Sequence, residues 1–547
     1  MARAKNVLFI MCDQLRHDYL SCGGHPHLHT PHIDGLAARG VRFDRAYVQS
    51  PICGPSRMSF YTGRYVISHG SSWNSYPLKV GELTLGDHLR PLGVDTVLIG
   101  KTHMKADAEG MARYGIEPGT VIGARLAECG FDVFERDDGL HPDTGYATSP
   151  RYNDWLRARG YDDANPWQAA ANSVDPEGNE TGTGWFLKYS DRAAKVAEEH
   201  SETPYLTTRF MEFIDSRTDD TPWMCHLSFI KPHWPYIVPA PYHDMFGPDT
   251  WLPPVRAESE RNDPHPVYKA FMDLRVSRNF SRDDVRETVL PGYMGLIKQM
   301  DDQMGRLFAF LDDRGLSDDT MIVFTSDHGD YLGDHWLGEK ELFHDPSVRI
   351  PLIVYDPSPE ADATRGTVSD ALVEAIDLAP TFLETFGGTA QPHRLEGRSL
   401  LPLLRGENPP WRKVAISEYD YAPTAVRAAL GRGAGDCRLI MAVSQRWKYV
   451  FAEGFRPMLF DLVADPQELN DLGADPACAD VCSDMREHVF AWARAQRQRI
   501  TMSDAAILSQ SERRTVDAGI LIGFWDEDEL SRMKRETDAD QPGRDNA

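Results

Sequence analysis

The stretch NVLFIMCDQ, residues 6–14, places an unbroken apolar run directly before Asp13 and Gln14. Four other stretches have the same shape: DTVLIGKTH (95–103), WMCHLSFIKPH (223–233), TMIVFTSDHGD (320–330) and RIPLIVYDP (349–357). Continuous apolar runs of this length, rich in β-branched residues, are typical of strands buried on both faces, as in a parallel sheet. The sequence therefore predicts a large and mostly parallel sheet.

Amphipathic helical patterns lie between these runs. The clearest has apolar residues at three- and four-residue steps from Tyr293 to Leu311, with Pro291 expected at its start and Gly315 just past its end. The alternation of strands and helices predicts an α/β fold in which helices sandwich a large mixed, mostly parallel sheet.

Changes in composition divide the 547 residues into candidate parts. We expect a catalytic domain over residues 1–405, within which residues 104–200, rich in Gly, Asp, Asn and Pro, form an excursion over the active-site face. Short strands and a helix predict a smaller α+β domain over 406–500. The tail, 501–547, is polar except for the apolar island ILIGFW (520–525), which predicts a contact in a homo-oligomer, a dimer or tetramer.

The overall charge is strongly acidic. With 58 Lys and Arg against 83 Asp and Glu, the formal net charge of −25 argues against nucleic acid and anionic membranes as partners. The first apolar run ends at Asp13, too early for an export signal, and no later segment reaches membrane-spanning length. The eight cysteines form no regular framework, as is typical of reduced thiols. A cytoplasmic location is therefore predicted.

Polar residues follow four of the predicted strands. They are Asp13 and Gln14, Lys101 and His103, Lys231 and His233, and Asp327 and His328. Any one of them could be a helix cap or a satisfied core residue. Because ligands bind beyond the carboxyl ends of the strands in open α/β sheets, four such ends together predict a functional site. Asp13, Asp327 and His328 are an oxygen-rich set that suits Ca²⁺ or Mn²⁺.

Cys53 lies in the motif CGPSR, residues 53–57, where Pro55 fits the first turn of a helix and Gly63 fits its end. Cys53 could be a half-buried residue at the start of this helix, or a thiolate nucleophile whose pKa the helix dipole lowers. The thiolate is disfavoured because His103 and His233 would share the site with a hard cation, whereas thiolates prefer soft ones. A third interpretation follows from a resemblance.

The CGPSR motif resembles the CxPSR signature of the formylglycine-dependent sulfatases of the alkaline phosphatase superfamily, in which this cysteine is oxidised to Cα-formylglycine. Other similar segments follow in the family's order over residues 5–475: NVLFIMCDQ, TGRY (62–65), GKTH (100–103), KPHWP (231–235), SDHGD (326–330), LEGRSLLPLL and LFDLVADPQELNDL. The resemblance implies an alkaline phosphatase-like fold and formylglycine at position 53. It also implies a formylglycine-generating enzyme as a maturation partner and a small sulfate or phosphonate ester as substrate.

The resemblance also implies roles for the matched residues. The predicted ligands of one divalent ion, Ca²⁺ or Mn²⁺, are Asp13, Cys53, Asp327 and His328. The predicted catalytic residues are Cys53, Arg57, Lys101, His103, His233 and Lys340, and the predicted substrate contacts are Gln14, Asn74, Lys101, His233 and Lys340. A hydrated aldehyde at position 53 would attack sulfur or phosphorus, with His233 as the general acid at the leaving group. His103 would then deprotonate the second hydroxyl and release the product.

The substrate prediction depends on two departures from the family pattern. Many sulfatases have two adjacent acidic residues where this chain has Asp13 and Gln14. Bacterial phosphonate monoester hydrolases share the Asp-Gln pair, the size and the C-terminal tail, but resemble sulfatases less at GKTH, where this chain keeps Lys101 and His103. We therefore predict an arylsulfatase-type hydrolase of sulfate monoesters with secondary phosphonate and phosphate ester hydrolysis. Two alternatives are a phosphonate monoester hydrolase or phosphodiesterase as the main activity, and a choline-sulfatase-like alkyl sulfatase.

Two other classes of protein remain as alternatives. A phosphomutase-type relative with an unmodified nucleophile would be favoured by Ser or Thr at position 53, where this chain has Cys. A catalytically inactive binding protein would be expected to lack one of the residues on which the mechanism depends. Asp13, Arg57, His233 and Asp327 are all present.

Overall fold

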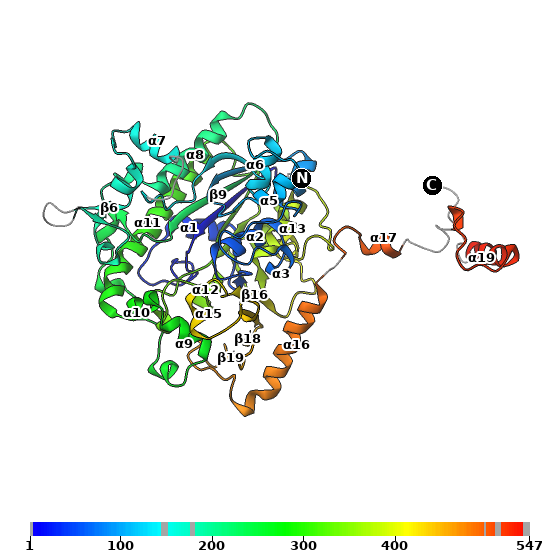
Figure 1. Cartoon of the computed structure of the whole chain (residues 1–547). Coiled ribbons are helices and arrows are strands. Elements are labelled where there is room, and N and C mark those ends of the chain that lie inside the picture. Colours follow the sequence, from blue (N-terminus) through cyan, green and yellow to red (C-terminus); the bar gives the residue numbers. More distant parts are fainter. Residues whose placement is uncertain (1–3, 144–150, 176–180, 497–498, 509–515, 540–547) are drawn as a thin grey trace. The chain divides into compact units, whose positions relative to one another are not determined.

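The computed structural model describes residues 4–143, 151–175, 181–496, 499–508 and 516–539 (Figure 1). The chain divides into two compact units, of which the first comprises residues 1–390 and 395–496 and the second comprises residues 391–394 and 497–547. The predicted excursion and tail extend into residues 144–150, 176–180, 509–515 and 540–547, which lie outside the described residues.

An eight-stranded sheet forms the centre of the first unit. Its strands, in spatial order, are β14 (Thr367–Ser369), β2 (Val41–Phe43), β13 (Leu352–Tyr355), β11 (Thr320–Ser326), β1 (Asn6–Asp13), β9 (Trp223–Pro232), β4 (Asp95–Gly100) and β5 (Asp132–Arg136). The run from β11 to β5 is parallel, whereas β13 is antiparallel to both of its neighbours. The prediction of a mixed, mostly parallel sheet is confirmed, and all five apolar runs supply strands to it.

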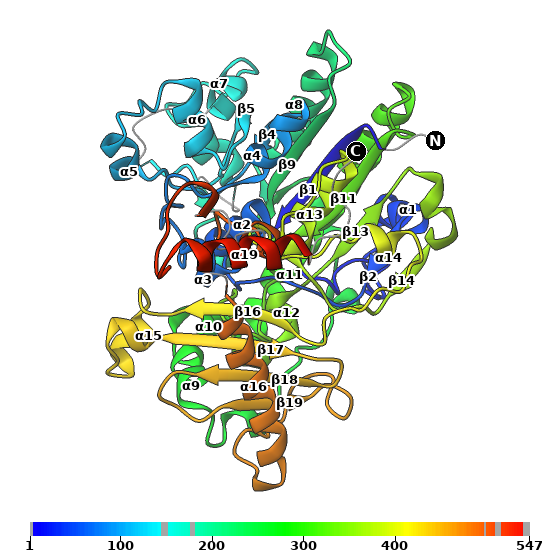
Figure 2. The same ribbon diagram turned by 90° about the vertical axis from the view of Figure 1, so that its right-hand side faces the viewer.

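Successive residues of β1 point into two separate cores, as the alternation of side chains along a strand requires. Phe9 packs with Phe60 and Phe382, and Ile10 belongs to the opposite core with Phe210 and Met304. The helices that carry these partners are α2 (Cys53–Thr62) and α13 (Leu378–Thr385) on one face, and α8 (Glu202–Ser216) and α11 (Asp283–Asp313) on the other. The sheet is therefore sandwiched between helices (Figures 1 and 2).

Helix α11 begins eight residues before the predicted start at Pro291, so the placement of this proline at the helix start was wrong. Asp283 and Asp284 occupy the first turn, where carboxylates stabilise the positive end of the helix dipole. Pro291 lies inside the helix, at the cost of one backbone hydrogen bond. Its side chain is buried among the core residues of the apolar stripe.

A smaller antiparallel sheet follows the large one along the chain and belongs to the same compact unit. Its strands are β16 (Ala415–Asp420), β17 (Arg438–Val443), β18 (Trp447–Ala452) and β19 (Met458–Asp461). Helix α16 (Ala479–Ala495) lies across it, and Met485 and Val489 pack with Tyr449 (Figure 2). The smaller C-terminal sheet domain expected from the sequence is thus present.

Two minor sheets complete the first unit. One contains β10 (Val238–Pro239), β8 (Ala193–Ala194), β6 (Ser173–Val174) and β7 (Gly182–Thr183), and the other contains β12 (Arg349–Ile350), β3 (Ala46–Tyr47) and β15 (Val373–Glu374). Strands of two residues have too little pattern to be predicted from sequence, so neither minor sheet was foreseen, including the part formed by β6, β7 and β8 within the excursion.

The second unit contains the helices α17 (Asp504–Leu508) and α19 (Glu527–Ala539). The apolar island between them is exposed, with Ile522 83% and Trp525 90% accessible. The oligomer contact expected there remains a prediction. No helix in the described part of the chain is both long enough and apolar enough to cross a membrane.

Candidate active site

The carboxyl ends of four parallel strands bring the predicted residues to one edge of the sheet. Asp13 is the last residue of β1, Lys101 follows β4, and Asp327 follows β11. His233 comes directly after β9. Lys101 Nζ lies 2.5 Å from Asp13 Oδ2, so the two strand ends are joined by a buried ion pair. Polar side chains from the four strand ends thus meet at this edge of the sheet, as the sequence predicts.

Cys53 is the first residue of α2 and is completely buried. Its Sγ lies 3.0 Å from His328 Nε2, 3.3 Å from Lys340 Nζ and 3.7 Å from Asp13 Oδ1. Burial opposes ionisation, but the charges of Lys340 and His328 hold the pKa of the Cys53 thiol well below its ordinary value. The sulfur therefore lies where an anionic group is stabilised.

Asp13, Asp327, His328 and Cys53 offer one donor atom each within 4.8 Å of one another. His328 Nδ1 lies 2.8 Å from the Gly329 carbonyl and donates to it, so Nε2 faces the two carboxylates, 3.7 Å from each, and can bind a cation once it has lost its own proton. These separations suit a hard cation with ligands at about 2.3 to 2.6 Å. Two carboxylates and one imidazole therefore fit a divalent ion such as Ca²⁺ or Mn²⁺.

Arg57 links the two carboxylates from behind. Its Nε lies 2.8 Å from Asp327 Oδ2 and its Nη2 lies 3.1 Å from Asp13 Oδ2, with all three side chains fully buried. The same guanidinium donates to Ser228 Oγ at 2.7 Å and to the Lys101 carbonyl at 3.0 Å. Although burial and Cys53 oppose it, Lys101 and Arg57 hold the pKa of Asp13 well below its usual range. Both carboxylates are thereby oriented.

Lys340 reaches Cys53 from the loop after β11. Its Nζ contacts Gln14 Oε1 at 3.0 Å and His233 Nε2 at 3.2 Å, in addition to the sulfur. His233 Nδ1 lies 2.7 Å from the Trp234 carbonyl and donates to it, which leaves Nε2 as an acceptor. Burial and the charge of Lys340 lower the pKa of His233 to about 4. The proton between these two side chains therefore belongs to Lys340.

Gln14 is held in one orientation by two residues that the sequence did not single out. Its Nε2 donates to Asp330 Oδ2 at 2.5 Å and lies 3.2 Å from Tyr236 OH, and Tyr236 OH itself donates to Asp330 Oδ2 at 2.6 Å. The amide oxygen must then face Lys340. Asp330 lies inside the quoted SDHGD segment and could have been flagged there, whereas Tyr236 follows KPHWP with no chemical signal of its own.

His103 and Asn74 also lie around Cys53. His103 contributes a hydrogen bond that lowers the pKa of Cys53, and its buried Nδ1 has no hydrogen-bond partner among the described residues. Its backbone adopts φ 55° and its N–H donates to Asp138 Oδ1 at 3.0 Å. Asn74 Oδ1 accepts from the Gly54 N–H at 2.7 Å, a structural contact at the start of α2.

Lys231 is the one polar residue of the four strand ends that turns away from the site. Its Nζ lies 3.1 Å from the Pro235 carbonyl and 3.6 Å from Glu202 Oε2. Its ammonium also donates to the His233 carbonyl at 3.4 Å, so it contacts the backbone of His233, whereas the His233 ring faces Lys340.

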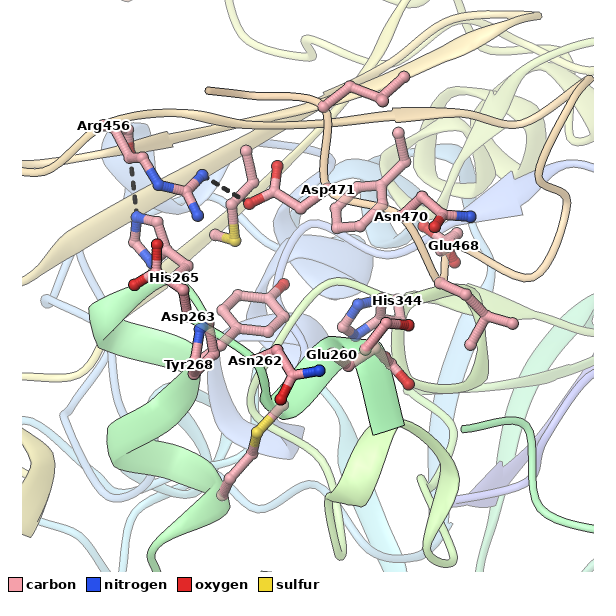
Figure 3. Close-up of a pocket in the computed structure, with 17 residues that line it drawn as sticks. Glu260, Asn262, Asp263, His265, Tyr268, His344, Arg456, Glu468, Asn470 and Asp471 are labelled. Carbon is pink, nitrogen blue, oxygen red and sulfur yellow. Dashed lines mark hydrogen bonds and ion pairs between the residues drawn. The ribbon is translucent and has the colours of Figure 1, made fainter. Parts of the chain in front are cut away.

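A cavity of about 330 Å³ lies elsewhere, between residues 259–272 and residues 456–472 (Figure 3). His344 lines it and stacks on His335 with ring centroids 3.7 Å apart and planes at 4°, and His335 Nδ1 lies 2.7 Å from Glu260 Oε1. The lone pairs of two stacked rings lie in two separate parallel planes, although Glu260, His335 and His344 each offer one donor atom within 4.8 Å of the others. None of the predicted site residues lines this cavity.

Comparisons with known proteins agree with this geometry. The family model described as Sulfatase matches residues 5–388, and the model described as N-sulphoglucosamine sulphohydrolase, C-terminal, matches residues 333–495. The chain is 32% identical over 521 residues to the multifunctional alkaline phosphatase superfamily protein PehA of Trinickia caryophylli, covering 90% of this chain and 96% of the relative.

Two further relatives cover most of the chain. An arylsulfatase of Clostridium perfringens is 26% identical over 485 residues, covering 85% of this chain and 90% of that protein. The crystal structure of the phosphonate monoester hydrolase of Agrobacterium radiobacter superposes with a TM-score of 0.78 at 29% identity, covering 91% of this chain and 97% of that one. With most of its length matched by the family model, the chain belongs to the sulfatase family of the alkaline phosphatase superfamily.

Proposed function

We propose that this protein hydrolyses sulfate monoesters through a formylglycine made from Cys53, with phosphonate monoesters as additional substrates. The observation that carries the proposal is the position of Cys53, which is buried in a cluster with Asp13, Asp327 and His328 and lies 3.3 Å from the ammonium of Lys340. The Cys53 sulfur stands where the oxygens of the hydrated aldehyde would lie. That arrangement offers positive charge on both sides of an attacking oxygen.

Asp13, Asp327 and His328 would hold the divalent ion. When bound, the ion supplies Lewis-acid stabilisation of negative charge on oxygen. Arg57 keeps the two carboxylates in place through its buried ion pairs, and Lys101 adds a second cation beside Asp13. These residues also neutralise the anionic ester, which would otherwise be repelled by a site with two carboxylates and a chain of formal net charge −25.

Lys340 is the group that we assign as proton donor at the leaving oxygen. Its three N–H groups point to Gln14, to position 53 and to His233 Nε2, and the His233 ring carries its proton on Nδ1. Lys340 would give one proton to the departing oxygen and become a neutral amine, while His233 Nε2 accepts another of its N–H groups and holds Lys340 in place. The proposal thus shifts the predicted general acid from His233 to the pair of Lys340 and His233. His103 stays the proposed base for product release, since its ring also contacts position 53.

Phosphonate monoesters are a second candidate for the main substrate. Two findings favour them: the Asp13-Gln14 pair in the sequence and the TM-score of 0.78 to a phosphonate monoester hydrolase. A site that stabilises charge on a tetrahedral oxyanion does not sharply distinguish sulfur from phosphorus. One site can therefore turn over both classes at different rates.

The proposal is tested by mass spectrometry of the tryptic peptide AYVQSPICGPSR, followed by kinetics on paired aryl sulfate and phenylphosphonate esters. We expect the aldehyde mass at position 53 and hydrolysis of both esters. Cys53→Ala should remove activity, whereas Cys22→Ala, at a half-buried cysteine outside the site, should retain it. An intact thiol in fully active protein contradicts the formylglycine mechanism, and a large preference for the phosphonate ester reverses the order of the substrates.

A further inference from the structure

A row of aromatic rings leads outward from His233. The His233 and Trp234 rings lie 4.7 Å apart at 36°, and the Trp234 and Trp185 rings lie 6.2 Å apart at 64°. Trp185 also contacts the buried ring of Trp167 at 5.7 Å. Trp234 is half-buried and Trp185 is 38% exposed, so the row passes from the buried site to the surface.

Trp185 is exposed and yet fixed in place. Its indole Nε1 donates to Gln168 Oε1 at 2.8 Å, and Gln168 Nε2 donates in turn to Thr183 Oγ1 at 3.1 Å. The preceding Gly184 leaves no room for a side chain, since a Cβ there would lie 2.4 Å from Asn172 Oδ1. An indole held by such contacts presents a defined apolar surface at little further entropic cost.

The location of this surface matches the path of the alcohol portion of the ester. Under the proposed function, Lys340 and His233 Nε2 face the leaving oxygen, because Lys340 Nζ lies 3.3 Å from Cys53 Sγ and 3.2 Å from His233 Nε2. Under the same proposal, we place the rest of the alcohol past the His233 ring. The next ring in contact with His233 is Trp234, and the next after that is Trp185.

We propose that Trp185 and Trp234 form a subsite for a flat aromatic alcohol portion of the ester, an inference that rests on the proposed function. Two indoles inclined at 64° offer one stacking face and one edge contact, which are the arrangements that aromatic pairs prefer. Trp185 belongs to residues 104–200, so the excursion expected over the active-site face supplies part of the subsite. The subsite selects esters by the area of their aromatic portion.

The test compares 2-naphthyl and phenyl esters, whose alcohols have similar acidity and differ in flat area. For Trp185→Ala we expect kcat/KM for the 2-naphthyl ester to fall about 3- to 10-fold, the range of one lost aromatic contact, with a smaller change for the phenyl ester. For the 2-naphthyl ester, kcat/KM of Trp185→Phe should lie between the values of the wild type and of Trp185→Ala. Binding of the product 2-naphthol, measured by quenching of protein fluorescence, should weaken by a similar factor without any turnover.

Phe490→Ala is the matched control, because Phe490 is 41% exposed and has one ring neighbour, Phe451, on the C-terminal sheet. It should leave the ratio of 2-naphthyl to phenyl turnover unchanged. If the wild-type enzyme is active, and Trp185→Ala and Trp185→Phe both keep its ratio of 2-naphthyl to phenyl turnover, the subsite is overturned. The proposed function is unaffected by that result. Wild-type enzyme that cleaves neither sulfate nor phosphonate esters contradicts the proposed function. In that case, binding of 2-naphthol that weakens in Trp185→Ala would still support the aromatic surface.

Discussion

Gln14 shows how one neutral side chain is given a single orientation. Asp330 and Tyr236 occupy both positions near its amide nitrogen, so the oxygen is directed to Lys340. Burial raises the pKa of Asp330, and its hydrogen bonds from Tyr236 and Gln14 oppose that shift. An amide that could rotate would instead place N–H groups toward the Lys340 ammonium and repel it.

Asp330→Asn should therefore misplace Lys340 but leave the binding of the ester intact. We expect kcat to fall about 10-fold or more while KM changes little, since a misdirected proton donor affects the transition state more than binding. The loss should be larger for esters of weakly acidic alcohols, which need the proton most. Steady-state kinetics on a series of aryl esters measures both effects.

The control for this variant is Tyr236→Phe, which keeps the ring and the Asp330 carboxylate and removes one hydroxyl. It should lose less activity than Asp330→Asn. Equal losses for all leaving groups in Asp330→Asn would mean that Asp330 supports the fold and does not orient Gln14.

At the scale of the elements, β9 carries a buried histidine in the centre of the sheet. His226 pairs with Phe9 of β1 in register, its Nε2 contacts Tyr61 OH at 2.9 Å, and it is fully buried. Burial and the charge of Arg57 lower its pKa from the ordinary value of 6.5 to about 3. Strand β9 therefore folds with a neutral imidazole in its middle.

Stability should fall as the pH drops below about 6.5, because the unfolded chain then binds a proton at His226 that the folded chain does not. At pH 5 this one group removes about 2 kcal/mol relative to pH 7.5. His226→Gln should have a lower free energy of unfolding at neutral pH. Between pH 7 and pH 5 this free energy should decline less steeply than in the wild type. Urea unfolding at several pH values measures the slope.

Exposed His488 on α16 supplies the comparison for this slope. His488→Gln should keep the wild-type pH dependence. If His226→Gln keeps it as well, other buried groups account for the acid sensitivity of the fold.

The strands of the large sheet were predictable because continuous apolar runs such as residues 6–12 have no other common explanation. The start of α11 was not predictable, because a proline such as Pro291 is typical of a first turn. Only the packing of its ring allows it an interior position. The site was predictable where it lies on strand ends. Cys53 and Lys340 come from a helix start and a loop, and only the family resemblance indicated that they meet.

Side-chain direction accounts for the remaining gaps. Lys231 and His233 end the same strand, yet Lys231 turns to Glu202. Tyr236 and Ser228 reach the site through packing that leaves no pattern in the sequence. Residues of this kind are found only once the neighbouring elements are placed.

On the scale of the whole molecule, the proposed metal ligands come from β1, from the residues after β11 and from the start of α2. Chelation should lower the unfolding temperature, because an ion present at 100 times its Kd contributes about 2.7 kcal/mol. The fold should nevertheless survive, since Arg57 still pairs with both Asp13 and Asp327. Differential scanning calorimetry with and without EDTA measures the shift.

Arg57→Met should make this dependence on metal larger. Removing one partner from a buried ion pair leaves an uncompensated charge that costs about 3 to 5 kcal/mol, and a bound cation would offset much of it. Asp327→Asn should abolish the calcium- or manganese-dependent shift. An unchanged unfolding temperature on chelation of the wild type would show that the three elements are held without an ion.

The complete burial of Cys53 has a consequence for biosynthesis. The proposed oxidation requires access to the thiol, yet in the folded chain Cys53 begins a helix and is 0% exposed. The proposed conversion would therefore compete with folding in time, and we expect a chain that folds first to keep its thiol. The fraction of active enzyme should then depend on how fast each host synthesises and folds the protein, even when every molecule in the preparation has the same fold.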